Sequence, residues 1–383
     1  MKWTVTTVVF CVGLLLALGM VMLSSASMVD KTSRLLVMQL IWAGVGLVAC
    51  IAAAAMDYRD LKKFSFVFFA LTLVLLILVL IPGIGVVRGG ARRWFSFGGV
   101  SFQPSEIAKI AIIIALAHYA EMQRKKMDTF VAGLLVPGVM IAVMLGLVFR
   151  EPDRGTTLLL AAVTGIMLLI AGVRWLYIVP PAAAAMSAFA YSIIHDPMRM
   201  KRIMSWTDLE ATKEGVGYQA YQAMIGLGSG GWTGLGLGNG RQKYGFVPEH
   251  HTDFIFFLIG EELGLVFTLG VVVLFFVLVV CGIRIAWRAR DTFGQLLATG
   301  ITFLIGLQAC INIGVVTSAL PNKGLPLPFI SYGGSNLLMM LACIGMLLSI
   351  ARQIPDEAPA PETPAPKKLP RRSANIFAAP EAV

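Results

Sequence analysis

Three acidic residues, Asp253, Glu261 and Glu262, lie within ten residues of one another where a polar stretch of the sequence is followed by an apolar run. Because Pro248 disfavours a helix interior and Thr252 is a good N-cap, we expect the helix to start at Thr252 and to hold Asp253 in its first turn. There Asp253 either takes part in proton transfer or only stabilises the helix through its dipole. Glu261 and Glu262 follow about 12 to 14 Å deeper. An unpaired charge costs several kcal/mol at that depth, so we expect them to have partners, a proton or a wet cavity.

A second acid and a lysine open another apolar run. Pro104 and Ser105 are expected to start a helix, which puts Glu106 in its first turn and Lys109 one turn deeper. The two can form an internal salt bridge. Alternatively, Lys109 reaches up to a phosphate or pairs with a deep glutamate.

A metal site is an alternative use of the residues around Asp253. Glu249, His250, His251 and Asp253 are all ordinary metal ligands. Adjacent histidines point in different directions on most backbones, and no second ligand pair is evident. We therefore predict no tight metal site. The five cysteines are scattered singly through apolar runs, which is typical of packing residues.

The composition is that of a membrane protein. The chain has 383 residues, of which 57% are hydrophobic and 14% charged, and a mean hydropathy of +0.81. The net charge of +10 lies in short loops, as membrane topology requires, so we predict no nucleic-acid partner. The first apolar run, residues 4–23, is too long for a signal peptide and predicts an uncleaved helix.

Ten apolar runs are long enough to span a bilayer. We therefore predict an all-α, polytopic integral membrane protein with about ten transmembrane helices in one domain, residues 1–353, and a large extracytoplasmic loop at 194–251 between helices 7 and 8. Beyond it, a Pro-, Ala-, Glu- and Lys-rich composition predicts a disordered cytoplasmic tail at 354–383. The ten runs are 5–24, 35–56, 64–82, 105–121, 129–149, 155–172, 174–193, 252–283, 295–318 and 334–352.

The basic loops set the expected orientation. The loops that start at Arg59, Arg124 and Arg284 fall on one side if the chain begins inside, so both termini should be cytoplasmic. The outer side then holds the segments 25–34, 83–104, 150–154, 194–251 and 319–333. Outer segments normally avoid Lys and Arg, and a bound anion such as a diphosphate explains why these do not. Their charged residues are Arg88, Arg92, Arg93, Arg150, Glu151, Asp153, Arg154, Lys243 and Lys323.

Two further outer loops carry turn chemistry. Residues 150–154 hold four charges around Pro152, which predicts a solvated turn. Residues 319–335 hold three prolines and three glycines, which predicts non-helical chain dipping into protein. The N–H groups from Ser331 to Ser335 could there form an anion nest.

Six motifs follow one another along the chain: Gly90-Ala-Arg-Arg-Trp94, Gln103-Pro-Ser-Glu-Ile-Ala-Lys109, Glu151-Pro-Asp-Arg-Gly-Thr156, Pro248-Glu-His-His-Thr-Asp-Phe-Ile-Phe256, Gly260-Glu-Glu-Leu-Gly264 and Pro321-Asn-Lys-Gly-Leu-Pro-Leu-Pro-Phe-Ile-Ser-Tyr-Gly-Gly-Ser335. Together they make the chain similar to the SEDS family, which comprises FtsW, RodA and SpoVE. The resemblance runs from the first helix to about Arg352. Within the family, Pro-Asn-Lys-Gly at 321–324 is most similar to the FtsW branch. Arg154 departs from the family, in which Leu is more usual at that position.

The resemblance implies a peptidoglycan glycosyltransferase of septal cell-wall synthesis, which polymerises lipid II at the outer face of the cytoplasmic (inner) membrane. Implied partners are lipid II and the growing lipid-linked glycan, a class B penicillin-binding protein (an FtsI-like transpeptidase), other division membrane proteins and membrane lipid. The implied essential acid is Asp253. The other implied site residues are Arg92, Arg93, Glu106, Lys109, Lys243, Lys323 and Ser331.

The chemistry of that reaction assigns roles. Joining two lipid-linked disaccharides needs a base for the acceptor hydroxyl, positive charge for the departing diphosphate and a dry groove. Asp253 is the expected base, in an inverting single displacement. The expected cofactor is at most a divalent cation (Mg or Mn), with no organic group. The candidates to hold diphosphates are Arg92, Arg93, Lys109, Lys243 and Lys323.

Three other functions stay open at this stage. A lipid II flippase would use the deep acids as a polar passage, but the charges concentrate toward one side and no inverted repeat is found. A non-catalytic scaffold for a transpeptidase explains aromatic outer segments but not buried acids. A RodA-type polymerase of cell elongation would share the chemistry and differ in its cellular role.

Overall fold

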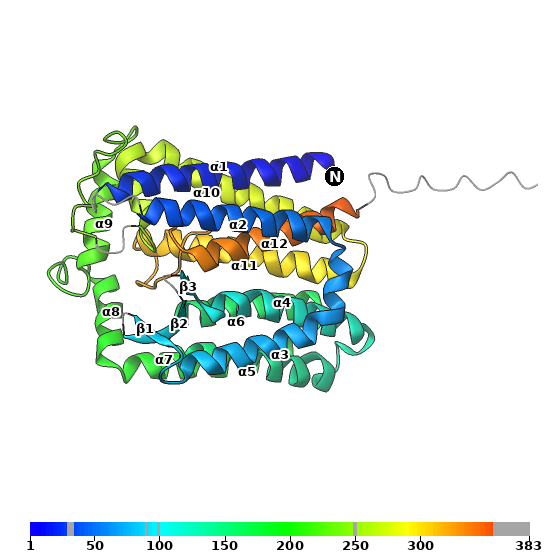
Figure 1. The fold of residues 1–383 in the computed structure, drawn as a ribbon. Coiled ribbons are helices and arrows are strands. Elements are labelled where there is room, and N and C mark those ends of the chain that lie inside the picture. Colours follow the sequence, from blue (N-terminus) through cyan, green and yellow to red (C-terminus); the bar gives the residue numbers. More distant parts are fainter. Residues whose placement is uncertain (29–33, 89, 98–99, 248–250, 355–383) are drawn as a thin grey trace, which may run out of the picture.

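A computed structural model describes residues 1–28, 34–88, 90–97, 100–247 and 251–354. Of its twelve α-helices, ten form a bundle, and each matches one of the ten predicted runs (Figure 1). The all-α, polytopic prediction is confirmed. The ten are α1 (Lys2–Ser27), α2 (Arg34–Ala55), α3 (Leu61–Leu80), α4 (Pro104–Met122), α5 (Val136–Arg150), α6 (Arg154–Ile170), α7 (Trp175–Ile194), α10 (Ile255–Arg288), α11 (Thr292–Val316) and α12 (Gly334–Arg352).

The bundle has the surface of a membrane protein. Eight of the described helices are long and apolar enough to cross a bilayer; α6 is shorter, and α4 carries Glu106, Lys109 and Glu121. Large apolar side chains such as Val48, Phe276 and others on the outer helices are exposed, as lipid contact allows. Short helical turns η1 (Tyr58–Asp60), η2 (Arg124–Lys126) and η3 (Val131–Leu135) join the helices.

The two ends of the bundle differ. The start of α1 and the end of α12 lie at one end (Figure 1). The opposite end, called the site end below, carries the longer connections. These contain α8 (Pro197–Thr207) and α9 (Tyr218–Ser229), within the predicted 194–251 loop, and three short antiparallel strands, β1 (Val86–Arg88), β2 (Ala91–Phe97) and β3 (Val100–Phe102). The predicted tail lies outside the described residues from 355 on.

The small sheet was not predicted. Its order is β1-β2-β3, with Val87 opposite Arg92 and Ser96 opposite Ser101. In Phe95-Ser96-Phe97 and Val100-Ser101-Phe102, serine alternates with apolar residues, and alternation with period two is the pattern of a strand. Strand pairing also satisfies backbone groups that lipid cannot.

Burial is uneven across the bundle. Helices α4, α11 and α12 form its centre, and most residues of α4 from Pro104 to Ala120 are buried. In contrast, α7 has no buried residue, and Pro180 and Pro181 lie inside it. This helix therefore lies at the periphery of the bundle.

Helix α10 is interrupted at Gly264, whose φ of 80° and ψ of −175° are not helical. The chain at 230–236 enters the break and supplies the missing hydrogen bonds. The N–H groups of Leu235 and Gly236 donate to the carbonyls of Glu261 and Glu262, at 3.0 Å each. On the other side of the break, the N–H of Leu265 donates to the carbonyl of Gly231 at 2.9 Å. The helix therefore consists of two segments, 255–263 and 265–288, which Gly264 connects and which the loop at 230–236 bridges by hydrogen bonds.

Gly264→Ala should destabilise the protein, because a Cβ there meets the nitrogen of Gly234 at 2.4 Å and the positive φ strains any L side chain. We expect a loss of roughly 1–3 kcal/mol, seen as a lower Tm in detergent. Gly270→Ala is the matched control, since a Cβ at Gly270 meets nothing within 4 Å. An equal Tm for both variants would contradict the strained break.

Candidate active site

A cavity of about 680 Å³ lies at the site end, between the start of α4, the turn before α6, the ends of α7 and α8, and the loop before α12. Asp253 lines it, together with polar and charged groups from six separate stretches of the chain. Sequence prediction placed Arg93, Glu106 and Lys323 here, and they do line it. Asp153 and Arg154, predicted only as charges of the outer face, line it too. Sequence prediction did not anticipate the following: Gln103, Arg199, Arg202 and Asn336.

Asp253 is held just before α10 and not in its first turn. The helix begins at Ile255 with Phe254 as its N-cap residue, so the predicted start at Thr252 is wrong. The physical reason is competition for the backbone: Ser331 Oγ donates to the carbonyl of Thr252 at 2.6 Å, and Asn312 Nδ2 donates to that of Asp253 at 2.7 Å. These bonds keep the segment as a turn that faces the cavity.

Asp253 lies against the loop before α12. A Cβ on Gly324 would come within 2.3 Å of Asp253 Oδ2, so only glycine allows the carboxylate to sit there. The neighbouring Lys323 lies over the ring of Phe189, with Nζ 4.7 Å from the ring centroid. Burial lowers the pKa of Lys323, and the charge of Arg154 lowers it further. The prediction that residues 319–335 form non-helical chain packed into protein is confirmed for 319–333, and α12 begins at Gly334.

Basic side chains outnumber their acidic partners in the cavity. Arg199 is paired with Asp196 at 2.7 Å. Arg154, Arg202 and Lys323 have no ion-pair partner within the described part of the chain. Three cations are therefore left to attract an anion into the same space as Asp253.

The predicted Glu106–Lys109 salt bridge is present. Lys109 Nζ lies 2.9 Å from both carboxylate oxygens and also donates to Gln308 Oε1 at 3.1 Å, and Asn336 Nδ2 donates to Glu106 at 2.8 Å. Lys109 is 1% exposed and does not line the cavity. Of the alternatives for Lys109, the internal pair is therefore the one the structure contains. Gln308 continues the network to the carbonyl of Pro326.

Two other predicted cations are committed elsewhere. Arg93 donates to the carbonyls of Glu151 and Pro152, at 2.8 Å each, and so clamps the turn before α6. Arg92 donates to the carbonyl of Leu80 and is not part of the cavity lining. Both arginines therefore shape the site end, and Arg93 alone presents a surface to the cavity.

Lys243 and Ser331 also lie away from the ligand space. Lys243 is 0% exposed and forms an ion pair with Glu262 at 2.7 Å. Ser331 is buried, and the N–H groups of Tyr332 and Gly333 donate to the carbonyl of His251 and to Gln39 Oε1. The N–H of Ser331 donates to the carbonyl of Leu327. The predicted anion nest at 331–335 is wrong, because three of its donors already have protein acceptors. Direct contact of Lys243 with a diphosphate is likewise excluded in this arrangement.

The chain is similar to known proteins over most of its length. Residues 5–355 match the family model FtsW/RodA/SpoVE, described as cell cycle protein. The chain belongs to the FtsW/RodA/SpoVE family. A probable peptidoglycan glycosyltransferase FtsW of Trichlorobacter lovleyi is 42% identical over 343 residues, covering 88% of this chain and 90% of that one. The stage V sporulation protein E of Bacillus subtilis is 38% identical over 346 residues, covering 88% and 94%.

Solved structures of FtsW/RodA/SpoVE relatives share the fold. A chain of a peptidoglycan synthase complex, described as coordinating polymerization and crosslinking, matches with a TM-score of 0.75 at 27% identity, covering 91% of this chain and 98% of that one. The rod shape determining protein RodA of Thermus thermophilus matches with a TM-score of 0.68 at 26% identity, covering 91% and 97%.

The turn before α6 is only partly solvated, because Arg150 and Pro152 are exposed but the acids Glu151 and Asp153 are buried, so the prediction of a solvated turn is wrong for the two acids. Glu151 is 0% exposed, and neither carboxylate oxygen has a hydrogen-bond partner among the described residues. Burial raises the pKa of Glu151 to about 9; the charge of Asp153 adds to the rise and that of Arg93 opposes it. Asp153 instead caps α6, accepting from the N–H of Thr156 at 3.0 Å.

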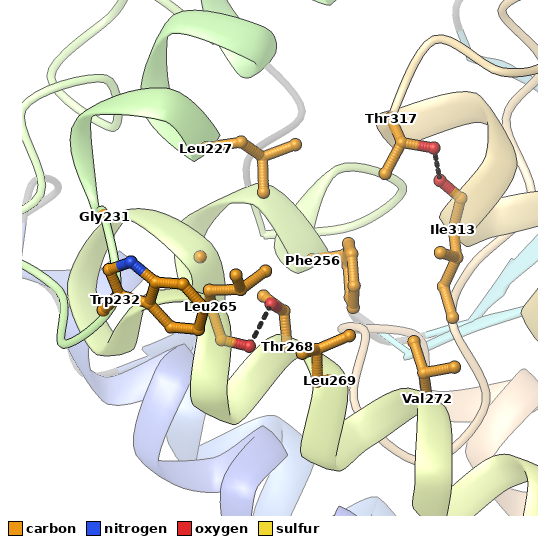
Figure 2. Close-up of a pocket in the computed structure, with 11 residues that line it drawn as sticks. Leu227, Gly231, Trp232, Phe256, Leu265, Thr268, Leu269, Val272, Ile313 and Thr317 are labelled. Carbon is orange, nitrogen blue, oxygen red and sulfur yellow. Dashed lines mark hydrogen bonds between the residues drawn. The ribbon is translucent and has the colours of Figure 1, made fainter.

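A second cavity, of about 500 Å³, is apolar. It lies beside the break in α10, where Trp232 and Leu265 face Leu227 and Phe256 across it (Figure 2). Its two hydroxyl groups, on Thr268 and Thr317, donate to carbonyls of their own helices and offer no free donor to a ligand. With no titratable side chain in its lining, this cavity cannot carry acid–base chemistry, and the candidate active site is the polar cavity around Asp253.

A metal cluster is not found in the described ranges, which contain no group of three His, Cys, Asp or Glu side chains able to hold an ion. Of the four residues considered for one, Glu249 and His250 lie outside those ranges. The other two, His251 and Asp253, lie on the turn before α10.

Glu151 should make stability depend on pH. Its folded pKa lies above the ordinary value of 4.5, so folding favours the protonated form, and stability present below pH 4.5 is lost progressively up to about pH 9. We expect a loss of roughly 3 to 4 kcal/mol between about pH 5 and about pH 8. Glu151→Gln should flatten the curve of Tm against pH. Glu210→Gln, at an exposed side chain, is the control that should leave the slope unchanged.

Proposed function

We propose that this chain is a peptidoglycan glycosyltransferase that polymerises lipid II, with Asp253 as general base. The observation that carries the proposal is the meeting, in one cavity, of Asp253 with the three cations Arg154, Arg202 and Lys323. Membership of a family whose relatives are named peptidoglycan glycosyltransferases supports it.

The base acts on the acceptor. The carboxylate of Asp253 takes the proton of a sugar hydroxyl, and the hydroxyl oxygen forms a bond to the anomeric carbon of the donor. The bond from that carbon to the diphosphate oxygen breaks on the opposite face, so the configuration inverts and undecaprenyl diphosphate leaves with the electron pair. Asp253 suits this role because its backbone is fixed from two sides by Asn312 and Ser331.

The basic residues act on the leaving group. Arg154, Arg202 and Lys323 come from different elements and line the cavity together with the loop at 321–326. Negative charge grows on the diphosphate as the bond breaks, and preorganised cations stabilise it without reorganisation. The charged form of Lys323 is stabilised most by a bound anion. Burial and the like charge of Arg154 lower its pKa, and an anion beside it would offset both.

A divalent cation, Mg or Mn, is a further proposal. Magnesium is commonly held by one or two carboxylates together with substrate phosphates, and Asp253 and Asp153 both line the cavity. When bound, the ion would neutralise diphosphate charge. The steps assigned above to the chain's own residues do not depend on it.

The setting follows from topology. We place the site end outside the cytoplasmic (inner) membrane, with both termini in the cytoplasm, because the basic loops of the other end obey the positive-inside rule. The relative in the synthase complex supports a class B penicillin-binding protein as partner. The Pro-Asn-Lys-Gly motif at 321–324 and the FtsW relatives favour septal synthesis over elongation.

Transport is disfavoured by where the buried charges lie. A flippase needs a polar passage through the bilayer. Within the described residues, every charged side chain that is buried belongs to the site end, and the middle of the bundle is apolar. These residues are Glu106, Lys109, Glu151, Asp153, Lys243, Glu261 and Glu262.

Asp253→Asn keeps the shape of the side chain and removes its basicity. We expect the rate of lipid II polymerisation by the purified chain with its transpeptidase partner to fall about 10²- to 10⁴-fold. Asp208→Asn, at an exposed acid of the same 194–251 segment, should keep the parent rate. A normal rate for Asp253→Asn would refute the base assignment, and movement of lipid II between leaflets without glycan product would favour a flippase.

Arg202→Gln and Lys323→Gln remove one cation each from the cavity. Each should lower kcat/KM for lipid II roughly 10- to 100-fold, since a charge-assisted contact to the diphosphate is lost. Lys213→Gln, at a half-exposed lysine outside the cavity, should leave kcat/KM unchanged. Steady-state kinetics over a range of lipid II concentrations decide this, and equal values for all three variants would remove these residues from the site.

A further inference from the structure

Asp253 is attached to a short helix whose far end is fastened to the rest of the protein. Residues 255–263, called the Asp253 half-helix below, run from the cavity to the break at Gly264, about 13 Å away. Their near end is fixed by the Asn312 and Ser331 bonds to the turn at 252–253. What fixes the far end therefore also bears on where the carboxylate of Asp253 stands.

The far end carries two acids in an unfavourable place. Glu261 and Glu262 occupy its last turn, next to the negative end of the helix dipole, and are 1% and 0% exposed. Both are compensated by the loop at 238–243. The N–H of Arg241 donates to Glu261 at 2.7 Å, and the N–H groups of Gly238 and Gly240 donate to Glu262 at 2.9 and 3.2 Å.

Lys243 joins this arrangement to a third element. Its Nζ lies 2.7 Å from Glu262 Oε1, 2.8 Å from Ser25 Oγ on α1 and 2.9 Å from the carbonyl of Gly238. Ser25 Oγ also lies 2.7 Å from both oxygens of Glu262. One ammonium group thus holds together α1, the loop and the half-helix, with no solvent access to either charge.

Close backbone contacts make the same junction stiff. A Cβ on Gly230 would lie 1.9 Å from the carbonyl oxygen of Gly260, and one on Gly234 would lie 2.1 Å from that of Glu262. The backbones of the loop and of the half-helix are therefore in direct contact, so a displacement of the loop would also displace the half-helix.

We propose that Lys243 is a positioning residue for glycosyl transfer: by pairing with Glu262 it fixes the half-helix, and thereby the place of Asp253 in the cavity. The inference rests on the proposed role of Asp253 as base. A misplacement of about 1 Å in a catalytic group can lower a rate about 100-fold. Lys243 does this without touching substrate, which separates it from Arg202 and Lys323.

The test compares Lys243→Met with the double variant Lys243→Met/Glu262→Gln, using purified full-length protein, its transpeptidase partner and lipid II. Lys243→Met should lower kcat about 10- to 100-fold and leave KM within about twofold. The double variant should recover at least about fivefold in kcat, because a Gln at 262 still accepts from the Gly238 and Gly240 amides but carries no charge. Lys213→Met is the matched control at a lysine with solvent access.

Folding is kept separate from positioning by expressing kcat per folded monomer, from size-exclusion and thermal unfolding. The acidic limb of the kcat/KM profile against pH should not move, since Asp253 remains the base. Where Lys243→Met does not fold, Ser25→Ala removes one hydroxyl from the same junction and should lower kcat about three- to tenfold.

Each other outcome overturns a distinct claim. A raised KM with normal kcat in Lys243→Met would show substrate contact and refute positioning. Parent kcat in both Lys243→Met and Ser25→Ala, with Asp253→Asn inactive, would refute positioning and leave the proposed function intact. Full activity of Asp253→Asn would instead refute the proposed function itself.

Discussion

A charge buried among apolar helices must be neutralised by a neighbour, and this constraint organises the site end. Two buried ion pairs meet it. Glu106 and Lys109 sit on one helix and recruit Gln308 and Asn336 from two others. The Lys243–Glu262 pair draws in α1 and a loop. Because lipid gives no hydrophobic force between helices, such polar contacts and close packing are what hold neighbouring elements together in a membrane.

Paired and unpaired charges consequently have different uses here. Buried pairs such as Glu106–Lys109 fix the frame, since breaking one would leave an isolated charge in apolar surroundings. Arg154, Arg202 and Lys323 line the cavity and have no ion pair within the described residues, so they can accept an anionic ligand without first breaking one. In Asp253 the two uses meet: its backbone carbonyl accepts a hydrogen bond from Asn312, and the residue lines the cavity.

The sequence was informative where the determinants are local. Hydropathy located all ten helices, because twenty apolar residues in a row satisfy a bilayer whatever they pack against. The Glu106–Lys109 pair followed from their spacing on one helix turn. Proline and glycine content correctly indicated the non-helical chain at 319–333.

Long-range partners could not be derived in the same way. Lys243 was assigned to a diphosphate because its pairing with Glu262 spans 19 residues and a loop whose path the sequence does not reveal. The start of α10 was misplaced because Ser331 and Asn312, far along the chain, compete for its first carbonyls. One signal was available: Gln308 and Asn312 are polar residues four apart in an apolar helix, a pattern that marks an inward face.

The exposed position of α7 bears on how a lipid-linked molecule enters and leaves. Phe189 and Ile193 of this helix form part of the cavity wall, yet none of its residues is buried against the bundle. In lipid, separating two helices costs the packing they lose, and α7 has little to lose. The α7 wall of the polar cavity is thus held by little packing. Under the proposed function, a lipid-linked substrate would pass between α7 and the rest of the bundle there, with its isoprenoid chain still in the bilayer.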